Sequence, residues 1–237
     1  MKRFFLLFLG FVLSLTTFAQ TDIQLHWVFG AKDQQAHLLS TVESFNVDKW
    51  GSTYFFIDMN YKVSDNLYGV NTSYWEISRN LRFWKPPIDF HVEYNGGFGM
   101  YEATPYNGAY EIKNAWLFGG QYTWASKDFN KIFILELLYK YIVREDYPSF
   151  QITGVWKLNF FKKKLTVSGF FDFWHENKDY THSDGTTNHT NMVFLSQPQF
   201  WYNFGQHFSM GSEIDLENNF IIENFRIVAT AAVKWTF

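Results

Sequence analysis

The chain has no cysteine among its 237 residues. It therefore has no disulfide framework and no thiolate metal site. This suits an exported protein that is stable by other means, although the absence alone identifies no compartment. Also missing are a Pro/Gly/Ser-rich linker, a charge block and a repeat of fixed period. Without such a division the sequence indicates one domain.

Three catalytic signatures are absent as well. The sequence contains no Gly-x-Ser-x-Gly elbow, no Gly-rich phosphate loop and no His-Glu-x-x-His zinc helix. We therefore expect no enzymatic activity, no cofactor and no bound metal. One alternative is a lipid hydrolase that assembles its Ser and His from different segments, with His175, His182, Ser183 and Asp184 as candidates.

A divalent-ion site is a second alternative for the same polar region. His182 and His189 lie near Asp179 and Asp184 in the sequence. Imidazole nitrogens and carboxylate oxygens are suitable ligands for such an ion. The ordinary composition of a solvated loop explains these residues equally well.

The N-terminus has the layout of a secretory signal. Lys2 and Arg3 precede an apolar run over residues 4–15, and Thr17 and Ala19 provide a small-residue exit. The run is shorter than the ~20 apolar residues that a membrane-spanning helix needs. We expect a signal peptide at residues 1–19 and a single domain over residues 20–237. The signal holds two of the 20 basic residues, which leaves 18 against 23 acidic ones, a mature charge near −5 that argues against a nucleic-acid partner.

Aromatic residues are abundant, with 28 Phe, 14 Tyr and 10 Trp, and they alternate with polar residues. At the C-terminus, residues 225, 227, 229, 231, 233, 235 and 237 are apolar, whereas Arg226, Thr230, Lys234 and Thr236 have the other parity. A period of two predicts β-strands with one apolar and one polar face. Similar runs recur along the chain and match the 9 to 11 residues of a tilted membrane-spanning strand. Residues 131–144 (KIFILELLYKYIVR) could form an amphipathic helix, but their alternation favours a strand.

Placing turns between these runs gives about twelve strands. The predicted fold is all-β, a transmembrane antiparallel β-barrel with both termini in the periplasm and residues 177–189 as a long outer loop. An even strand count is expected of a bacterial barrel. Closure also removes open sheet edges, whose backbone N–H and C=O groups would find no hydrogen-bond partners in lipid. Rings near strand ends are expected to form the interfacial girdles: Trp27, Trp84, Trp124, Trp201, Trp235 and Phe237.

The strand parity assigns most remaining charged residues to the barrel interior. These side chains either pair across strands and fill the interior, or line a water-filled path that selects solutes. Inward rings could stack a flat solute or narrow the path, and they include Tyr54, Phe56, Phe170, Trp174 and Trp201. The candidate lumen residues are Tyr54, Phe56, Asp58, Glu76, His91, Glu93, Lys113, Glu136, Lys140, Phe170, Asp172, Trp174, Glu213, Asp215 and Arg226.

The layout resembles the Tsx-like family of nucleoside-specific channel-forming outer-membrane proteins and related uncharacterised barrels. The likeness rests on DKWGSTYFFIDMNY (48–61), YWEI (74–77), FFDFWHE (170–176) and the final KWTF. The resemblance implies a twelve-stranded monomeric barrel that takes up nucleosides passively, with bases stacked on aromatic rings. It also implies that the barrel assembly machinery reads the last strand, so that Phe237 acts as an assembly signal.

The sequence thus predicts a protein of the Gram-negative outer membrane that contacts membrane lipids. The first hypothesis is a passive, selective channel for small polar solutes, with nucleosides as the leading candidates. The second is a barrel with a filled interior that serves a structural or loop-mediated binding role. The third is the lipid hydrolase.

Overall fold

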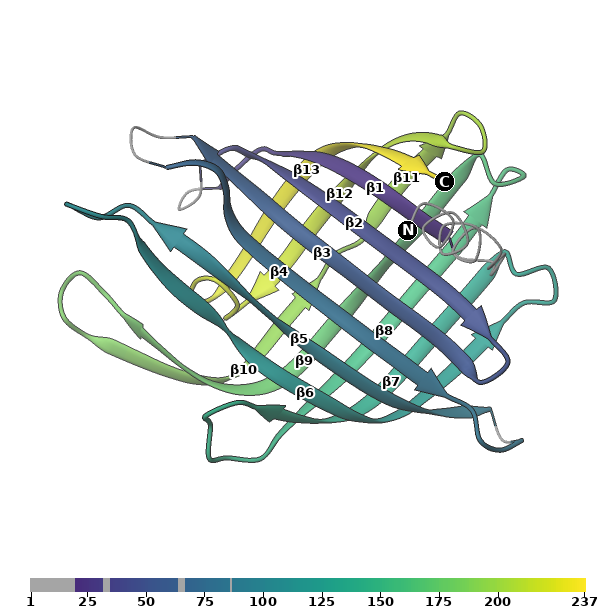
Figure 1. The fold of residues 1–237 in the computed structure, drawn as a ribbon, viewed down its shortest axis with the longest axis horizontal. Helices are drawn as coiled ribbons and strands as arrows, with labels where there is room; N and C mark the ends of the chain where they lie inside the picture. Colours follow the sequence, from purple (N-terminus) through teal and green to yellow (C-terminus); the bar gives the residue numbers. More distant parts are fainter. Residues whose placement is uncertain (1–19, 32–34, 64–66, 86) are drawn as a thin grey trace, which may run out of the picture.

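The computed structural model describes residues 20–31, 35–63, 67–85 and 87–237. The predicted signal peptide lies outside these described residues. Among them, no helix is long and apolar enough to cross a membrane. The described strands form one antiparallel sheet (Figure 1). Their bounds are β1 (Gln20–Val28), β2 (His37–Asp48), β3 (Gly51–Val63), β4 (Tyr68–Leu81), β5 (Ile88–Tyr101), β6 (Gly108–Ala125), β7 (Lys131–Ile142), β8 (Ser149–Phe160), β9 (Leu165–Thr181), β10 (Thr187–Ser196), β11 (Gln199–Asn203), β12 (Phe208–Asn218) and β13 (Phe225–Thr236).

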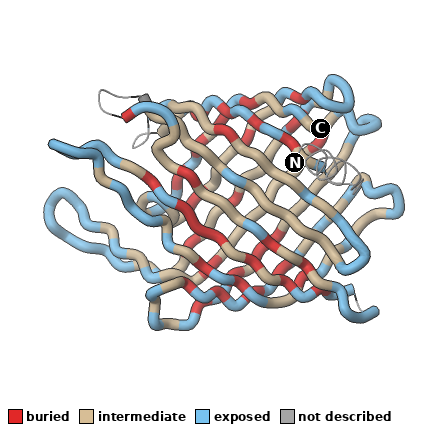
Figure 2. The backbone as a smooth tube through the Cα atoms, in the orientation of Figure 1, coloured by how far each residue is buried: buried red, intermediate tan, exposed pale blue. Residues whose placement is uncertain are grey.

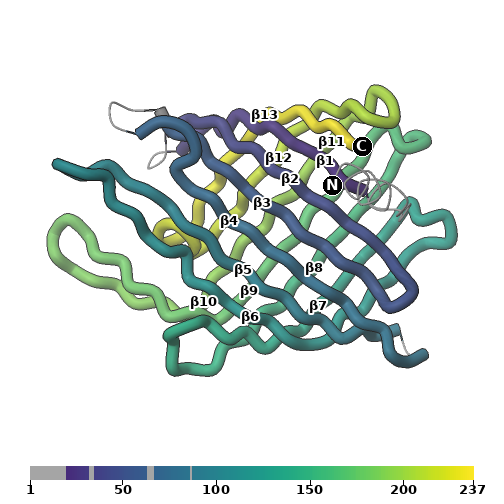
Figure 3. Tube along the Cα trace, viewed as in Figure 1, coloured from purple at the N-terminus to yellow at the C-terminus, as the bar shows by residue number. Residues whose placement is uncertain are grey.

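The sheet closes on itself, because β13 pairs with both β12 and β1. Figure 3 shows the purple β1 beside the yellow β13. β10 and β11 share one position in the sheet, since each pairs with β9 on one side and β12 on the other. The described residues therefore form a closed barrel of twelve strand positions, which confirms the predicted all-β antiparallel barrel. The periplasmic location of the termini stays a prediction.

The break between β10 and β11 lies at Gln197 and Pro198. Proline has no N–H to donate to a neighbouring strand. The Gln197 N–H still donates to the Phe170 carbonyl at 3.0 Å, and the Pro198 carbonyl accepts from the Ile214 N–H at 3.0 Å. The neighbouring strands thus remain connected across the break, although the ladder is irregular there.

The segment that could have been a helix is a strand, as predicted. Within β7 the side chains from Leu135 onward alternate strictly between exposed and buried. The apolar side chains of Leu135, Leu137 and Tyr139 are exposed, whereas Glu136 and Lys140 are buried. The period-two pattern therefore outweighs the high helix propensity of Leu, Glu and Lys.

The barrel is polar inside and apolar outside. Polar side chains outnumber apolar ones among the buried residues of the described chain, and large apolar side chains dominate its exposed surface. Figure 2 shows the buried positions recurring along the strands, with exposed positions between them. A water-soluble barrel would have the opposite distribution, because it must bury its apolar side chains.

Two details of the prediction are wrong. Most of the expected outer loop at residues 177–189 is a hairpin instead, since β9 continues to Thr181 and β10 begins at Thr187. Cross-strand pairs such as Thr181 with Thr187 hold this polar extension together, and it projects beyond the neighbouring strand ends (Figure 1). The second error is the assignment of Trp201 to an outer girdle, since Trp201 is fully buried; its expected place among the inward rings is confirmed.

Candidate functional site: the barrel lumen

The fifteen candidate lumen residues come from eight of the strands, and all lie on the inner face. Directly paired residues share a face, so the register links them in rows. One row joins Phe56 to Glu76, and another joins Glu93 through Leu117 to Lys140. Lys113 also reaches inward, where its ammonium lies 3.4 Å from Glu176 of β9. The structure therefore gives these residues a common location, and their role in solute passage stays a prediction.

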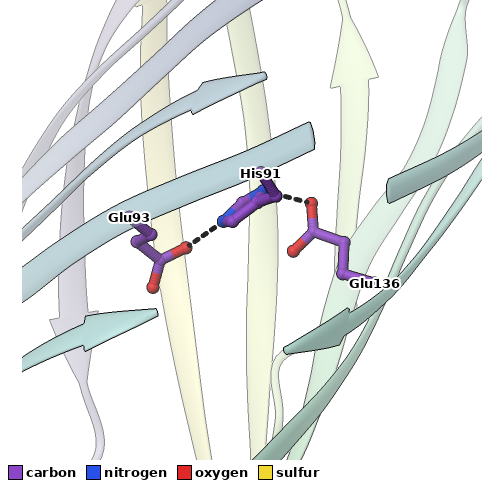
Figure 4. Close-up of side chains that lie close together, drawn as sticks. All are labelled: His91, Glu93 and Glu136. Atoms are coloured by element: carbon purple, nitrogen blue, oxygen red, sulfur yellow. Dashed lines mark hydrogen bonds and ion pairs between the residues drawn. The ribbon is translucent and has the colours of Figure 1, made fainter. Parts of the chain in front are cut away.

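One buried charged group is a triad of His91, Glu93 and Glu136 (Figure 4). His91 Nε2 lies 3.1 Å from Glu93, and His91 Nδ1 lies 3.3 Å from Glu136 and 2.9 Å from Asn80 Oδ1. Both ring nitrogens thus face oxygen acceptors, an arrangement that a doubly protonated imidazole satisfies. These three residues have ligand-type atoms within 4.8 Å of one another. In the observed geometry, however, the ring itself occupies the space between the two carboxylates.

A glycine on the intervening strand makes room for the triad. His91 is on β5 and Glu136 on β7, and Gly119 of β6 pairs with His91 on one side and Leu138 on the other. A Cβ at Gly119 would lie 2.0 Å from the Leu137 carbonyl oxygen. The close approach therefore requires glycine, and no side chain from β6 separates the imidazole from Glu136.

Two lysines lie over buried tryptophan rings inside the barrel. The Lys140 ammonium is 4.6 Å from the Trp174 ring centroid and donates to Gln151 at 2.9 Å. The Lys234 ammonium is 4.1 Å from the Trp201 ring centroid. Both distances fit cation–π contacts. A ring therefore holds each of the two cations, and an amide oxygen also holds Lys140.

A third set of rings lines the inner face of β3 and β4. The Phe56 ring centroid lies 6.1 Å from that of Tyr54 and 5.9 Å from that of Tyr74. The tyrosine hydroxyls donate to carboxylates, Tyr54 to Glu43 at 3.3 Å and Tyr74 to Glu76 at 2.6 Å. Unlike the fully buried Trp201, these three rings are partly accessible. They form a polar-edged aromatic surface, which we call the β3–β4 ring ladder.

Several lumen carboxylates accept hydrogen bonds from neutral groups. Asp58 accepts from Thr41 at 2.5 Å, Glu213 from Gln199 at 2.5 Å and Asp215 from Gln197 at 2.9 Å. Glu217 differs, because Arg226 contacts it at 2.7 Å. Among the candidate lumen residues, the carboxylates that form no ion pair within 4.0 Å in the described chain are Asp58, Glu76, Asp172, Glu213 and Asp215.

The residues of the two chemical alternatives do not converge. His182 contacts Glu223 at 2.9 Å, and His189 contacts Asp179 at 2.6 Å. These pairs are separate, so the described residues of this region do not gather into the alternative divalent-ion site. His175 packs instead against rings, 5.3 Å from Tyr147 and 6.4 Å from Phe150 between centroids. The geometry gives the hydrolase hypothesis no assembled Ser–His pair among these residues.

A family model described as "Domain of unknown function (DUF5020)" matches residues 19–237. The chain belongs to this family. The family match is to DUF5020 and not to the Tsx-like family specifically, and nucleoside specificity stays a prediction. No curated protein matches the chain.

Solved structures similar to this DUF5020 chain include outer-membrane barrels. The KdgM porin matches with a TM-score of 0.46 at 9% identity, covering 92% of this chain and 99% of that one. The Acinetobacter baumannii outer membrane protein Omp33 matches with a TM-score of 0.42 at 11% identity, covering 93% and 98%. OmpT, an outer membrane protein of Vibrio cholerae, matches with a TM-score of 0.41 at 7% identity, covering 92% and 96%.

Sequence reasoning missed parts of the DUF5020 lumen. His26 accompanies Trp201, with ring centroids 6.0 Å apart, and its nitrogens contact Gln24 and Thr230. The alternation of Asp22, Gln24 and His26 with apolar residues in β1 was the available signal. An apolar patch on the inner face of β6 and β7 had no such signal, because its residues share the parity of charged ones: Ala115, Leu117, Leu138 and Ile142.

Proposed function

We propose that this DUF5020 protein is a Gram-negative outer-membrane channel that passes small polar solutes passively and prefers cations. The inverted distribution of side chains supports a membrane location, because an apolar outer surface suits lipid. A polar interior provides groups that can replace water around a passing solute. The proposed action depends on position and electric field, without covalent chemistry.

The observation that carries the cation preference is the set of lumen carboxylates without an ion pair in the described chain. Asp58, Glu213 and Asp215 accept neutral hydrogen bonds, which orient a carboxylate without cancelling its charge. Lys140 and Lys234 also form no ion pair in the described chain, but the unpaired carboxylates outnumber them. An excess of charge of one sign in a confined path attracts mobile ions of the opposite sign.

Nucleosides remain the first solutes to test. The β3–β4 ring ladder is partly accessible, and its tyrosine hydroxyls and neighbouring carboxylates can hydrogen-bond a sugar or a base. Base–aromatic stacking contributes about 1 to 3 kcal/mol per base. Trp174 and Trp201 are less suited to stacking, because they are buried and each has a lysine ammonium over its ring.

The test is a planar-bilayer recording of the refolded mature chain in a KCl gradient. We expect discrete openings with a reversal potential on the cation-selective side, and partial block by added nucleosides. The double variant Glu213→Gln/Asp215→Asn should lower the cation-to-anion permeability ratio by roughly twofold or more, because two lumen charges are removed. Asp146→Asn removes an exposed loop charge outside the strands and should leave the ratio unchanged.

Two results would contradict the proposal in different ways. Demonstrably folded protein that never conducts would favour a filled interior with a structural or loop-mediated binding role. If the double variant and Asp146→Asn both conduct with the same ion selectivity, the protein is a channel. In that case Glu213 and Asp215 do not determine its selectivity. If nucleosides block the wild type, Phe56→Leu should weaken that block by roughly tenfold, the equivalent of one stacking contact.

A further inference from the structure

The loop between β12 and β13, residues 219–224, folds across the inner face of β10. The Asn219 side-chain amide donates to Thr190 Oγ1 at 3.0 Å and to the Met192 carbonyl at 3.2 Å, both on β10. The Tyr180 hydroxyl of β9 donates to the Asn219 carbonyl at 2.7 Å. The loop thus reaches two strand positions away from β12 and covers part of the lumen wall.

This position brings Phe220 against the ring of Trp174. The two ring centroids are 5.7 Å apart at an interplanar angle of 78°, an edge-to-face contact. The Lys178 ammonium donates to the Phe220 carbonyl at 2.6 Å and lies 5.3 Å from its ring centroid. Phe220 is therefore held by its ring and by its backbone, beside an inward residue of β9.

The far side of the loop is anchored independently. Glu223 contacts His182 at 2.9 Å and accepts a hydrogen bond from the Asn188 amide at 2.9 Å. Both partners belong to the β9–β10 hairpin. Because contacts to the hairpin fix the loop at both ends, the inward position of Phe220 is part of the fold.

We propose that this loop is the constriction of the channel and that Phe220 is its selecting residue. The inference rests on the proposed channel function. An apolar ring in a narrow water path raises the cost of passage for hydrated solutes, because water leaves apolar constrictions readily. Solutes that enter from the end of the barrel with the β12–β13 loop meet Phe220 beside Trp174. There, Phe220 limits the size and polarity of the solutes that pass.

The experiment compares Phe220→Ala with Ile221→Ala in bilayers and in liposomes swollen by sugars of graded size. Ile221 is in the same loop but has 59% of its surface exposed, so its removal is a matched control. Phe220→Ala should raise single-channel conductance by roughly twofold or more and admit larger sugars. Ile221→Ala should behave as the wild type. The unboiled gel mobility of each variant establishes that its barrel is folded.

The outcomes separate this inference from the channel proposal. A conducting wild type with an unchanged Phe220→Ala variant would overturn the constriction and leave the channel. A silent wild type with a conducting Phe220→Ala variant would support Phe220 as the blocking residue. Silence from both folded proteins would overturn the channel and its constriction together.

A second variant tests the inward position of the β12–β13 loop without removing Phe220. The chain has no cysteine, so Asn219→Cys/Thr190→Cys introduces an unambiguous pair at two side chains in hydrogen-bond contact. We expect the pair to oxidise in the folded barrel and the conductance to stay at the wild-type level. A pair that stays reduced, or a conductance lost on oxidation, would show that the conducting state has the loop elsewhere and would contradict the proposal.

Discussion

At the scale of single residues, charged side chains inside the barrel have two kinds of partner, namely opposite charges and neutral hydrogen-bond donors. His91 lies between Glu93 and Glu136 and is 1% exposed, so its charge and theirs are satisfied within the protein. Asp215 instead accepts a neutral amide hydrogen bond from Gln197. The ion-paired triad links β5 to β7. The carboxylate with a neutral partner leaves an electric field in the lumen that acts on a passing solute.

His91→Leu should destabilise the barrel strongly. It leaves two buried carboxylates without their shared partner, and breaking a buried ion pair costs about 3 to 5 kcal/mol. The free energy of unfolding, measured by urea titration in liposomes, should fall by that amount. His189→Leu is the control, because His189 and Asp179 form an exposed pair worth about 0 to 1 kcal/mol. Equal losses for the two variants would show that the triad is no stronger than a surface pair.

Residue parity in the sequence could place side chains inside or outside, because an antiparallel strand alternates its faces. It therefore located Glu136 and Lys140 in the interior even within an apolar segment. It could not locate Phe220, since loop residues have no period and the loop position depends on contacts with β9 and β10. Nor could it show which charges pair, because pairing depends on register between strands.

At the scale of elements, short turns fix the register of the strands. In the turn between β6 and β7, the Asp128 carboxylate accepts hydrogen bonds from Ser126 Oγ at 2.6 Å, from the Asn130 amide side chain at 2.7 Å and from the Asn130 N–H at 3.2 Å. These bonds, that from Ser126 first, lower the pKa of Asp128 from 3.8 to about 2. The exposed carboxylate thus closes the turn in its ionised form.

The turn therefore makes a pH-dependent contribution to stability. Because the pKa of Asp128 is lower in the folded state, its contribution is fully present above about pH 4 and is lost as the pH falls towards 2. Asp128→Asn should be less stable than the wild type at pH 6, and the two should converge near pH 2. Urea midpoints across this range would measure the difference. A gap that stays constant to pH 2 would mean that the charge plays no part.

The sequence predicted most elements well, because alternation over nine or more residues is a strong signal. The β9–β10 hairpin was the main error, since its polar composition is typical of a loop. Outside a membrane both faces of a strand meet water, so the apolar alternation that identifies the other strands is absent there. Cross-strand hydrogen bonds, such as that between Thr181 and Thr187, then hold the hairpin instead of apolar burial.

At the scale of the whole molecule, closure depends on the pairing of the first and last strands. β13 pairs with β1 from Asp22 with Thr236 to Val28 with Thr230. The Phe237 N–H adds one further bond to the Thr21 carbonyl at 3.0 Å, and the Phe237 ring is 69% exposed. The final residue is therefore available both to complete the seam and to contact another protein.

Deleting Phe237 should lower the amount of assembled barrel in the outer membrane several-fold. The deletion removes the last bond of the seam and the aromatic end expected to be read by the assembly machinery. Heat-modifiable mobility of the membrane fraction would measure it, with Phe129→Ala, an exposed ring in the turn between β6 and β7, as the control. Normal amounts of the truncated barrel would remove any role of Phe237 in assembly.

For the proposed outer-membrane channel, the length of β9 has a consequence for access to the tip of the β9–β10 hairpin. Its 17 residues extend roughly 55 Å, and at a tilt near 45° they rise further than the ~30 Å of a hydrocarbon core. The hairpin tip around Gly185 is therefore a place where a protease or an antibody could meet the chain without entering the membrane. A cut there would divide the polypeptide into two pieces, each holding several strands, which the remaining interstrand bonds would keep in a single barrel until boiling separated them.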